Sequence, residues 1–143
     1  MASILKINTL TGVSTAGSIA VTGEGNSTTT NMQNGLAKAW VNFNHTTIDS
    51  GTDLDGVRKS FNIASVVDVN TGRANTNLTN PMADADHIST GSAGDASQGS
   101  ARMLHLDDGG GNTASAIVSN VENIAASVID AEYVAIVTHG DLA

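Results

Sequence analysis

Hydrophobic and polar positions alternate with a period of two along much of the chain after residue 38. A period of two places successive side chains on opposite faces of a β-strand. The first alternating run covers residues 39–44, and the second covers residues 61–70. One face of the second run carries Phe61, Ile63, Ser65, Val67 and Val69. The pattern predicts a strand at each place, with one buried face and one exposed face.

A turn signal separates the second run from a third. Asn70-Thr71-Gly72 is followed by residues 73–78, in which Ala74, Thr76 and Leu78 share one face. Two alternating runs joined by so short a segment predict a β-hairpin. Pro81 closes the third run, at a point where its missing N–H does little harm.

Further strand-like runs fill the rest of the chain, and Gly-rich breaks lie between them. The runs cover residues 87–90, 101–106, 114–121 and 132–138, and the breaks cover residues 91–94 and 107–112. Many short strands separated by Gly, Asn and Asp turns are typical of an antiparallel β-sandwich. We therefore predict an all-β fold, with the sandwich formed by residues 31–143.

Two segments carry a helical signal. Thr30 and Gln33 have the spacing of a capping box, but Gly35 costs about 1 kcal/mol relative to Ala in a helix. A helix between residues 30 and 38 would therefore have at most two turns. Residues 120–130 carry apolar side chains at helical spacing, so this segment is either a strand with a loop or one amphipathic helix.

Residues 1–30 differ from the rest in composition. Two short β-prone runs, residues 3–8 and 18–22, are separated and followed by small polar residues. Two such strands are marginal in water on their own. We predict an extended N-terminal attachment arm that becomes ordered against a partner, with a disordered leader as the alternative. The apolar docking residues would be Ile4, Leu5, Ile7, Ile19 and Val21.

The chain has few large side chains with which to build a core. Aromatic residues make up 3% of the sequence, and they are Trp40, Phe43, Phe61 and Tyr133. We predict that these four lie in the core with Ile63, Val134 and Ile136, or that they serve in recognition by stacking on a sugar or anchoring an interface. A chain with so little apolar bulk gains stability by burying surface against copies of itself. A homo-oligomer is therefore expected.

Charge and composition exclude several classes of protein. The net charge is −8 and the six basic residues are scattered, whereas nucleic-acid phosphates require clustered cations. No apolar run approaches the roughly 20 residues that span a bilayer, and the first residues lack the pattern of a signal peptide. The absence of cysteine excludes disulfides and thiolate chemistry. We expect a soluble protein, made in a cytoplasm, that binds no nucleic acid and inserts into no membrane.

One segment has the ligand types of a metal site. Asp84 and Asp86 precede His87, and together they offer oxygen and imidazole ligands, although a plain turn between strands is the favoured interpretation. Residues 107–112 are too acidic for a phosphate-binding loop and lack its Gly-Lys-Ser/Thr sequence. No nucleophile elbow is present. We predict no enzymatic activity and no cofactor.

A second acidic segment, residues 49–56, resembles a calcium loop only in part. Its carboxylates alternate before Gly56, as in such loops. Aligned to the full pattern, however, Gly51 occupies the first ligand position and Asn62 occupies the position of the bidentate Glu. A solvated turn is favoured here.

Several segments carry a resemblance to known proteins. They cover residues 2–12, 35–44, 60–68, 70–72, 80–86 and 131–141, and the run Lys38-Ala39-Trp40-Val41 is among them. Together they resemble the N-terminal arm and the β module of tail-fibre and other virion structural proteins of marine bacteriophages, including cyanobacterial phages. The resemblance implies a non-enzymatic, cofactor-free virion protein that assembles as a trimer.

The chain departs from this pattern in two places. Residues 73–79 lack the aromatic side chains usual on the partner strand, and Thr138-His139 replaces a more apolar end of the last run. We expect a fibre-type virion subunit that docks through its N-terminal arm, contacts capsid or tail proteins, and forms a homotrimer. A capsid decoration protein and a carbohydrate-binding host-recognition module are the alternatives.

Overall fold

The computed structural model describes residues 5–11, 19–22, 29–51, 53–96, 101–106 and 111–141. The chain divides into two compact units, residues 1–36 and 37–143. The boundary predicted after residue 30 lies earlier than this division, inside a strand of the first unit. Apart from one helical turn, the regular elements of the described residues are β-strands, so the predicted all-β class is confirmed.

The first unit contains a small two-stranded sheet. β1 (Ala20–Thr22) and β2 (Thr29–Asn31) pair in antiparallel fashion. α1 (Met32–Gly35) follows as a single turn, within the predicted limit of two turns. The N–H of Met32, at the start of this turn, donates a hydrogen bond of 2.9 Å to the carbonyl of Ile19. This bond ties the turn back to the start of β1.

The pairing of β1 differs from the sequence prediction. Residues 5–8 form no strand, although a strand was predicted for residues 3–8. β1 pairs instead with a Thr-rich segment, and the hydroxyls of Thr22 and Thr29 lie 3.3 Å apart across the pair. Threonine is β-branched and favours extended backbone, but it leaves no apolar alternation in the sequence. For that reason the pattern did not show β2.

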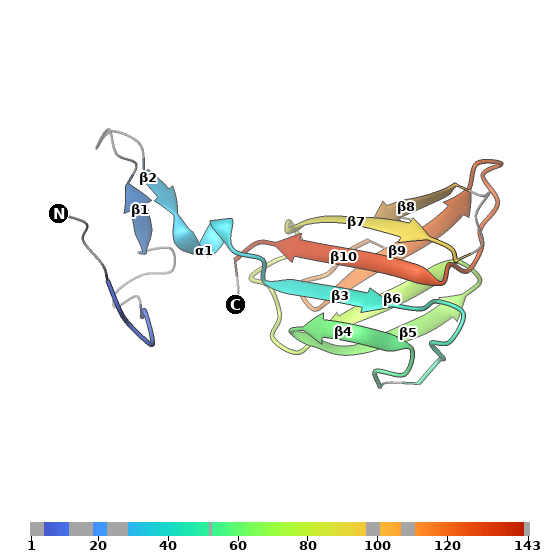
Figure 1. The fold of residues 1–143 in the computed structure, drawn as a ribbon, viewed down its shortest axis with the longest axis horizontal. Coiled ribbons are helices and arrows are strands. Elements are labelled where there is room, and N and C mark those ends of the chain that lie inside the picture. The colour runs from blue at the N-terminus through green and yellow to red at the C-terminus, as the bar shows by residue number, and fades with distance from the viewer. Residues whose placement is uncertain are drawn as a thin grey trace. The chain divides into compact units, whose positions relative to one another are not determined.

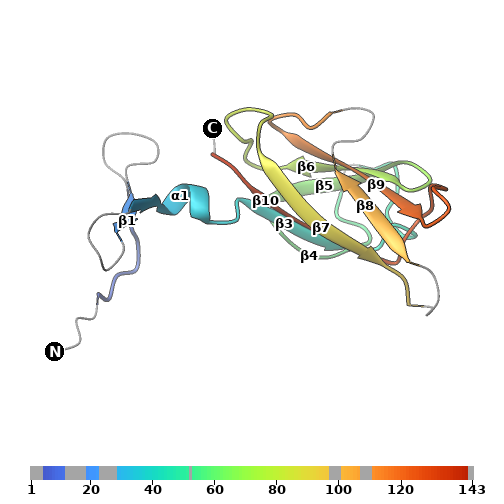
Figure 2. The ribbon, with the colours of Figure 1, turned by 90° about the horizontal axis from the view of Figure 1, so that it is seen from above.

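The second unit is a β-sandwich of two four-stranded antiparallel sheets. The first sheet has the order β4-β3-β10-β7 and the second sheet has the order β5-β6-β9-β8. Figure 1 and Figure 2 show the two sheets face to face. The strands are β3 (Ala39–Phe43), β4 (Val57–Phe61), β5 (Ile63–Asn70), β6 (Arg73–Leu78), β7 (Ile88–Gly94), β8 (Arg102–Leu106), β9 (Ala116–Asn123) and β10 (Tyr133–His139).

The core lies between the sheets and has little bulk. Phe43 and Met82 are the largest fully buried side chains. Threonine and serine hydroxyls also lie in the core, at Thr76, Ser119 and Thr138. The buried positions of β3 and β6 alternate along each strand, as the predicted period of two requires, and they are Ala39, Val41, Phe43, Ala74, Thr76 and Leu78. Ile63, Val134 and Ile136 belong to the same hydrophobic cluster.

The predicted hairpin is present between β5 and β6. Asn70 pairs with Arg73, which leaves Thr71-Gly72 as a two-residue turn. Gly72 has a φ of 75°, a left-handed conformation that glycine adopts without steric cost. Its N–H donates to Asp130 Oδ1 at 2.7 Å. The turn is thereby fixed against the loop that precedes β10.

The predicted run of residues 61–70 is two strands, one in each sheet. Asn62 separates them with a φ of 59°, a left-handed conformation in which Asn is enriched. A register shift between Ile63 and Ser65 then changes the phase of β5. The prediction of one continuous face is therefore wrong. Val66, which is 1% exposed, faces the core, and Phe61 lies outside it.

The predicted break at residues 91–94 lies inside β7. Gly91 pairs with Ile136, and a Cβ atom placed on it would lie 2.3 Å from the carbonyl oxygen of Ala135 and 2.6 Å from Leu104 Cδ2. Glycine here permits a close approach of backbones rather than a turn. Of the other predicted break, residues 107–110 lie outside the described residues.

The ambiguous segment of residues 120–130 is a strand followed by a loop. β9 extends to Asn123, whose side-chain Oδ1 accepts the N–H groups of Ala125 (2.9 Å) and Ser127 (3.1 Å). Asn competes with helix formation through such local bonds. Of the two alternatives, the amphipathic helix is wrong. Ile124, one of the apolar residues at helical spacing, is 79% exposed.

Candidate binding face

The outer face of the first sheet gathers the exposed aromatic side chains of the sandwich. Trp40 is 39% exposed, Phe61 is 53% exposed and Tyr133 is 46% exposed. Placement of these three in the core is therefore corrected, whereas Phe43 is fully buried. Trp40 alternates with the buried Ala39 and Val41 and so points outward. A strand period alone does not identify which phase is buried when both phases contain apolar residues.

Strand register arranges this face in rows. In one row Trp40 stands beside Phe61 on one side and beside Val137 on the other, and Val137 stands beside Thr90. Directly opposite residues on one face of a sheet have Cβ atoms about 4.5–5.5 Å apart. The row therefore places two aromatic side chains of adjacent strands next to a smaller apolar residue and a hydroxyl.

The next row lies along the same face. It contains, from β4 to β7, Lys59, Asn42, Ala135 and Ser92. The small side chains of Ala135 and Ser92 leave space beside the larger Trp40. Here the face has a groove of about 420 Å³, lined by Trp40, Val41, Asn42, Thr90, Gly91, Ser92, Ala135, Ile136 and Val137.

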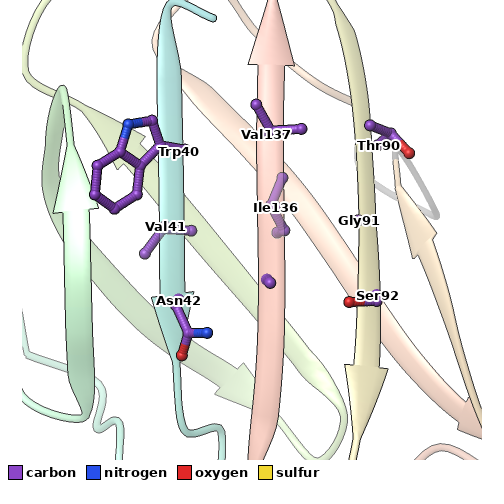
Figure 3. Close-up of a pocket in the computed structure, with 9 residues that line it drawn as sticks. Trp40, Val41, Asn42, Thr90, Gly91, Ser92, Ile136 and Val137 are labelled. Carbon is purple, nitrogen blue, oxygen red and sulfur yellow. The ribbon is translucent and has the colours of Figure 1, made fainter.

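Figure 3 shows how the groove is built. The indole of Trp40 lies over the β4 side of β3, whereas Thr90 and Ser92 project from β7 on the other side. Val137 and Ala135 on β10 form the apolar centre between them. The groove thus combines an aromatic surface, an apolar floor and two hydroxyl groups.

Arg58 contacts two residues of this face, Asn42 and Tyr133. Its Nη1 donates to Asn42 Oδ1 at 3.3 Å and to the carbonyl oxygen of Phe43 at 3.1 Å. Its guanidinium carbon lies 4.4 Å from the centroid of the Tyr133 ring, within range of a cation–π contact. Because Arg58 occupies Oδ1, the amide Nδ2 of Asn42 is directed toward β10, as Figure 3 shows.

The charge of the first sheet differs from that of the whole chain. The chain has 14 acidic and six basic residues, yet the strands of the first sheet contain no Asp or Glu. Two of the six basic residues, Arg58 and Lys59, lie in β4, and both are exposed. The acidic residues near this sheet lie in the loops that flank it. Within these strands the exposed Arg58 and Lys59 of β4 therefore give the face a local positive charge.

The two acidic segments, residues 84–87 and 49–56, form turns in their described parts, as the favoured interpretation of each predicted. Asp84 Oδ1 accepts the N–H of Asp86 at 2.8 Å, and the ring Nε2 of His87 forms a hydrogen bond of 3.1 Å with the carbonyl oxygen of Thr113. Asp49 and Asp53 likewise accept backbone N–H groups two residues further on, at 2.6 and 3.0 Å. Among the described residues, no group of three or more His, Asp or Glu side chains is arranged to hold a metal ion.

The acidic loop has a structural role instead. The carbonyl of Asp53 accepts the N–H of Val66 at 3.1 Å, and that of Asp49 accepts the N–H of Asp68 at 2.6 Å. These two N–H groups belong to β5, an edge strand of the second sheet. Edge strands present unpaired backbone groups that promote aggregation. The loop therefore covers one edge of the sandwich.

A buried histidine was not identified from the sequence. His45 is 2% exposed, and its Nε2 and Nδ1 atoms lie 3.9 Å from Asp68 Oδ1 and 3.8 Å from Asp130 Oδ1. Its backbone N–H donates to the carbonyl of Ala131 at 2.9 Å. The three side chains come from segments far apart in the sequence, so no spacing revealed them. His45 follows β3 of the first sheet and Asp68 belongs to β5 of the second sheet, so the three side chains meet where the two sheets come together.

The predicted docking residues lie in the first unit. Leu5 is 81% exposed, and Ile7 and Val21 are each 51% exposed, whereas Ile19 is partly buried. Ile4 lies outside the described residues.

No family model, curated protein or solved structure matches this chain at a significant level. Among the described residues, no helix has the length and apolar character to cross a membrane.

Proposed function

We propose that this chain is a bacteriophage virion structural protein: a non-enzymatic, fibre-type surface or appendage subunit that docks onto the particle through its N-terminal unit. One contrast carries this assignment. The sandwich has a hydrophobic core of its own, although Trp40, Phe61, Tyr133 and other apolar side chains on its surface are exposed. The described large apolar residues of the first unit belong to no such core, and most of them are exposed.

The exposed large apolar residues of the first unit are spread over all its described parts. They are Leu5, Ile7, Leu10, Val21 and Leu36, and each is at least 51% exposed. The core cluster of the protein includes none of them. A hairpin with three residues in each strand is marginal in water without further packing. Burial of these side chains against a partner removes apolar surface from water, at about 25 cal/mol per Å².

The resemblance of residues 2–12 and of the strand segments to marine phage virion proteins supports the same function. In this proposal the chain assembles as a homotrimer, is made in the host cytoplasm and resides in the virion. Because the core of the sandwich contains few large side chains, contact with further copies of the chain would add to its stability.

The proposal is tested with phage particles that carry point variants of the full-length chain. Leu5→Asp combined with Ile7→Asp places charges on the proposed docking surface. We expect the doubly substituted protein to fold but to be lost from purified particles, as quantified by mass spectrometry. Leu54→Asp is the matched control, because Leu54 is 42% exposed on a loop of the sandwich. Normal incorporation of the double variant rules out docking through this unit.

Electron cryomicroscopy of the same particles distinguishes the two kinds of virion subunit. Copies of an appendage subunit lie on the tail or on a fibre, in threefold groups for a homotrimer. Copies of a capsid decoration protein follow the symmetry of the head. Density at the head in every capsomer replaces the fibre assignment with decoration.

A further inference from the structure

We propose that the groove on the first sheet binds an anionic oligosaccharide, one whose sugar units carry carboxylate or sulfate groups. This binding site is independent of docking through the N-terminal unit. Three features of the groove argue for it: its shape, its aromatic and polar lining, and the charge of the strands around it.

The size of the groove fits a small ligand. About 420 Å³ lies within the range of roughly 300–1,000 Å³ that is typical of ligand pockets. A second copy of the chain would instead require about 800 Å² of contact on each partner. Lysine is depleted at protein interfaces, yet Lys59 lies exposed in the row that contains Asn42. These features favour a sugar chain over a second sandwich as the occupant.

The lining matches the two kinds of surface that a sugar presents. The faces of a pyranose ring carry C–H groups, which pack against the indole of Trp40. The ring hydroxyls can both donate and accept hydrogen bonds. Asn42 Nδ2 offers a donor, and the hydroxyls of Thr90 and Ser92 on β7 offer both functions. An extended sugar chain that lies across β3, β10 and β7 meets all four side chains.

The charge pattern selects an anionic sugar. A chain with a net charge of −8 repels polyanions in general. The first sheet is an exception, because its strands contain Arg58 and Lys59 and no carboxylate. Lys59 stands next to Asn42 in the same row, and Arg58 is hydrogen-bonded to Asn42. A carboxylate or sulfate at one end of the ligand is therefore attracted to β4.

The chain contains its own reporter for this test. Trp40 is the only tryptophan, so intrinsic fluorescence follows events at the groove. The full-length protein is titrated with three probes: a hexamer of galacturonate, a sulfated dextran oligomer and an uncharged dextran oligomer. We expect a saturable change in fluorescence with at least one anionic probe and none with the uncharged probe. The affinity should fall as salt increases, because exposed charges are screened.

Variants are compared by isothermal titration calorimetry with whichever anionic probe binds. Trp40→Ala should weaken binding about tenfold through loss of stacking. Lys59→Gln should weaken binding roughly two- to fivefold, as expected for an exposed charge pair. The matched control is Ile88→Ala, since Ile88 is 73% exposed on β7 but does not line the groove. Circular dichroism and thermal melting confirm that each variant is folded, and Asn42→Ala provides a second test of the groove.

Each outcome decides the matter. Equal affinity for charged and uncharged oligomers removes the anionic specificity. The absence of saturable binding by all three probes, in folded protein, removes the sugar site. If Trp40→Ala or Asn42→Ala abolishes self-association of the chain rather than sugar binding, the occupant of the groove is a second copy. Loss of docking in the Leu5 and Ile7 variants leaves sugar binding unchanged, so the two proposals fail separately.

Discussion

The two outer faces of the sandwich arise from the same alternation of residues but present different chemistry. The strands of the first sheet contain all four of the Phe, Trp and Tyr residues of the chain, whereas the strands of the second sheet contain none. Three of those four side chains are exposed. The outward positions of β6 carry Arg73, Asn75 and Asn77 instead. One face is dominated by exposed aromatic side chains, whereas the other carries polar side chains together with aliphatic ones such as Met103, which is 47% exposed.

Hydrogen bonding separates the faces further. On the second sheet, Asn77 Nδ2 donates to Ser65 Oγ at 2.9 Å, between neighbouring positions of β6 and β5. These polar groups are engaged with neighbours within the sheet. On the first sheet, Thr90 and Ser92 are exposed beside the groove. The hydroxyls on the first sheet are therefore accessible to solvent, whereas Asn77 and Ser65 on the second sheet are hydrogen-bonded to each other.

The largest effect is expected from the contrast between the two phenylalanines of the first sheet. Phe43→Ala removes a fully buried ring and should lower the free energy of unfolding by about 3–5 kcal/mol. Phe61→Ala removes a ring that is 53% exposed and should cost less than about 1 kcal/mol. Urea denaturation of both variants measures the difference. Equal losses would contradict the assignment of Phe61 to the outer face.

A second test concerns the glycines of β7. Gly91→Ala places a methyl group 2.3 Å from the backbone oxygen of Ala135 and 2.6 Å from Leu104 of the second sheet. We expect a loss of about 1–3 kcal/mol in the free energy of unfolding through overpacking. Gly94→Ala is the matched control, because its nearest neighbour, Tyr133 Cβ, is 4.0 Å away. If Gly94→Ala is as destabilising as Gly91→Ala, the loss reflects strand conformation rather than the close approach.

The sequence predicted the parts of this fold that depend on local patterns. The alternation in β3 and β6 and the turn at Thr71-Gly72 follow from a period of two and from glycine, which are local properties. The sequence predicts a break within β7 because glycine at position 91 is a common turn signal. Glycine is required at this position because the carbonyl oxygen of Ala135, on the neighbouring strand β10, leaves no room for a Cβ atom. Tertiary contacts of this kind leave no local pattern.

The candidate site was predictable only in its residue types. Trp40 was singled out, but its partners in the groove come from β7 and β10, which lie far from it in the sequence. The absence of acidic residues from the first sheet was also visible only after the strand order brought four segments together. For the same reason, His45 between Asp68 and Asp130 was not identified.

The change of sheet at Asn62 is expected to depend on its backbone conformation. Asn62→Ala keeps a φ of 59°, which costs an ordinary residue roughly 1–2 kcal/mol. It also loses the hydrogen bonds from Nδ2 to the carbonyl of Lys38 and from the N–H of Asn80 to Oδ1. We expect a total loss of about 2 kcal/mol in the free energy of unfolding. Asn62→Gly relieves the backbone strain and should be less destabilised in thermal denaturation. An Asn62→Gly variant that melts no higher than Asn62→Ala assigns the loss to the hydrogen bonds alone.

The smallest effect distinguishes the two outer faces directly, through one asparagine on each. Asn77→Ala removes the partner of a buried serine hydroxyl on the second sheet, since Ser65 is 4% exposed. The expected loss in the free energy of unfolding is about 1 kcal/mol. Asn42→Ala on the first sheet should change the free energy of unfolding by less than about 0.5 kcal/mol. The side-chain oxygen of Asn42 accepts a hydrogen bond from Arg58, which is exposed, so little is lost with it. The effect of Asn42→Ala should appear instead as weaker binding of an anionic oligosaccharide. If Asn42→Ala lowers stability as much as Asn77→Ala and leaves sugar binding intact, both asparagines serve the sheet, and the functional difference between the faces disappears.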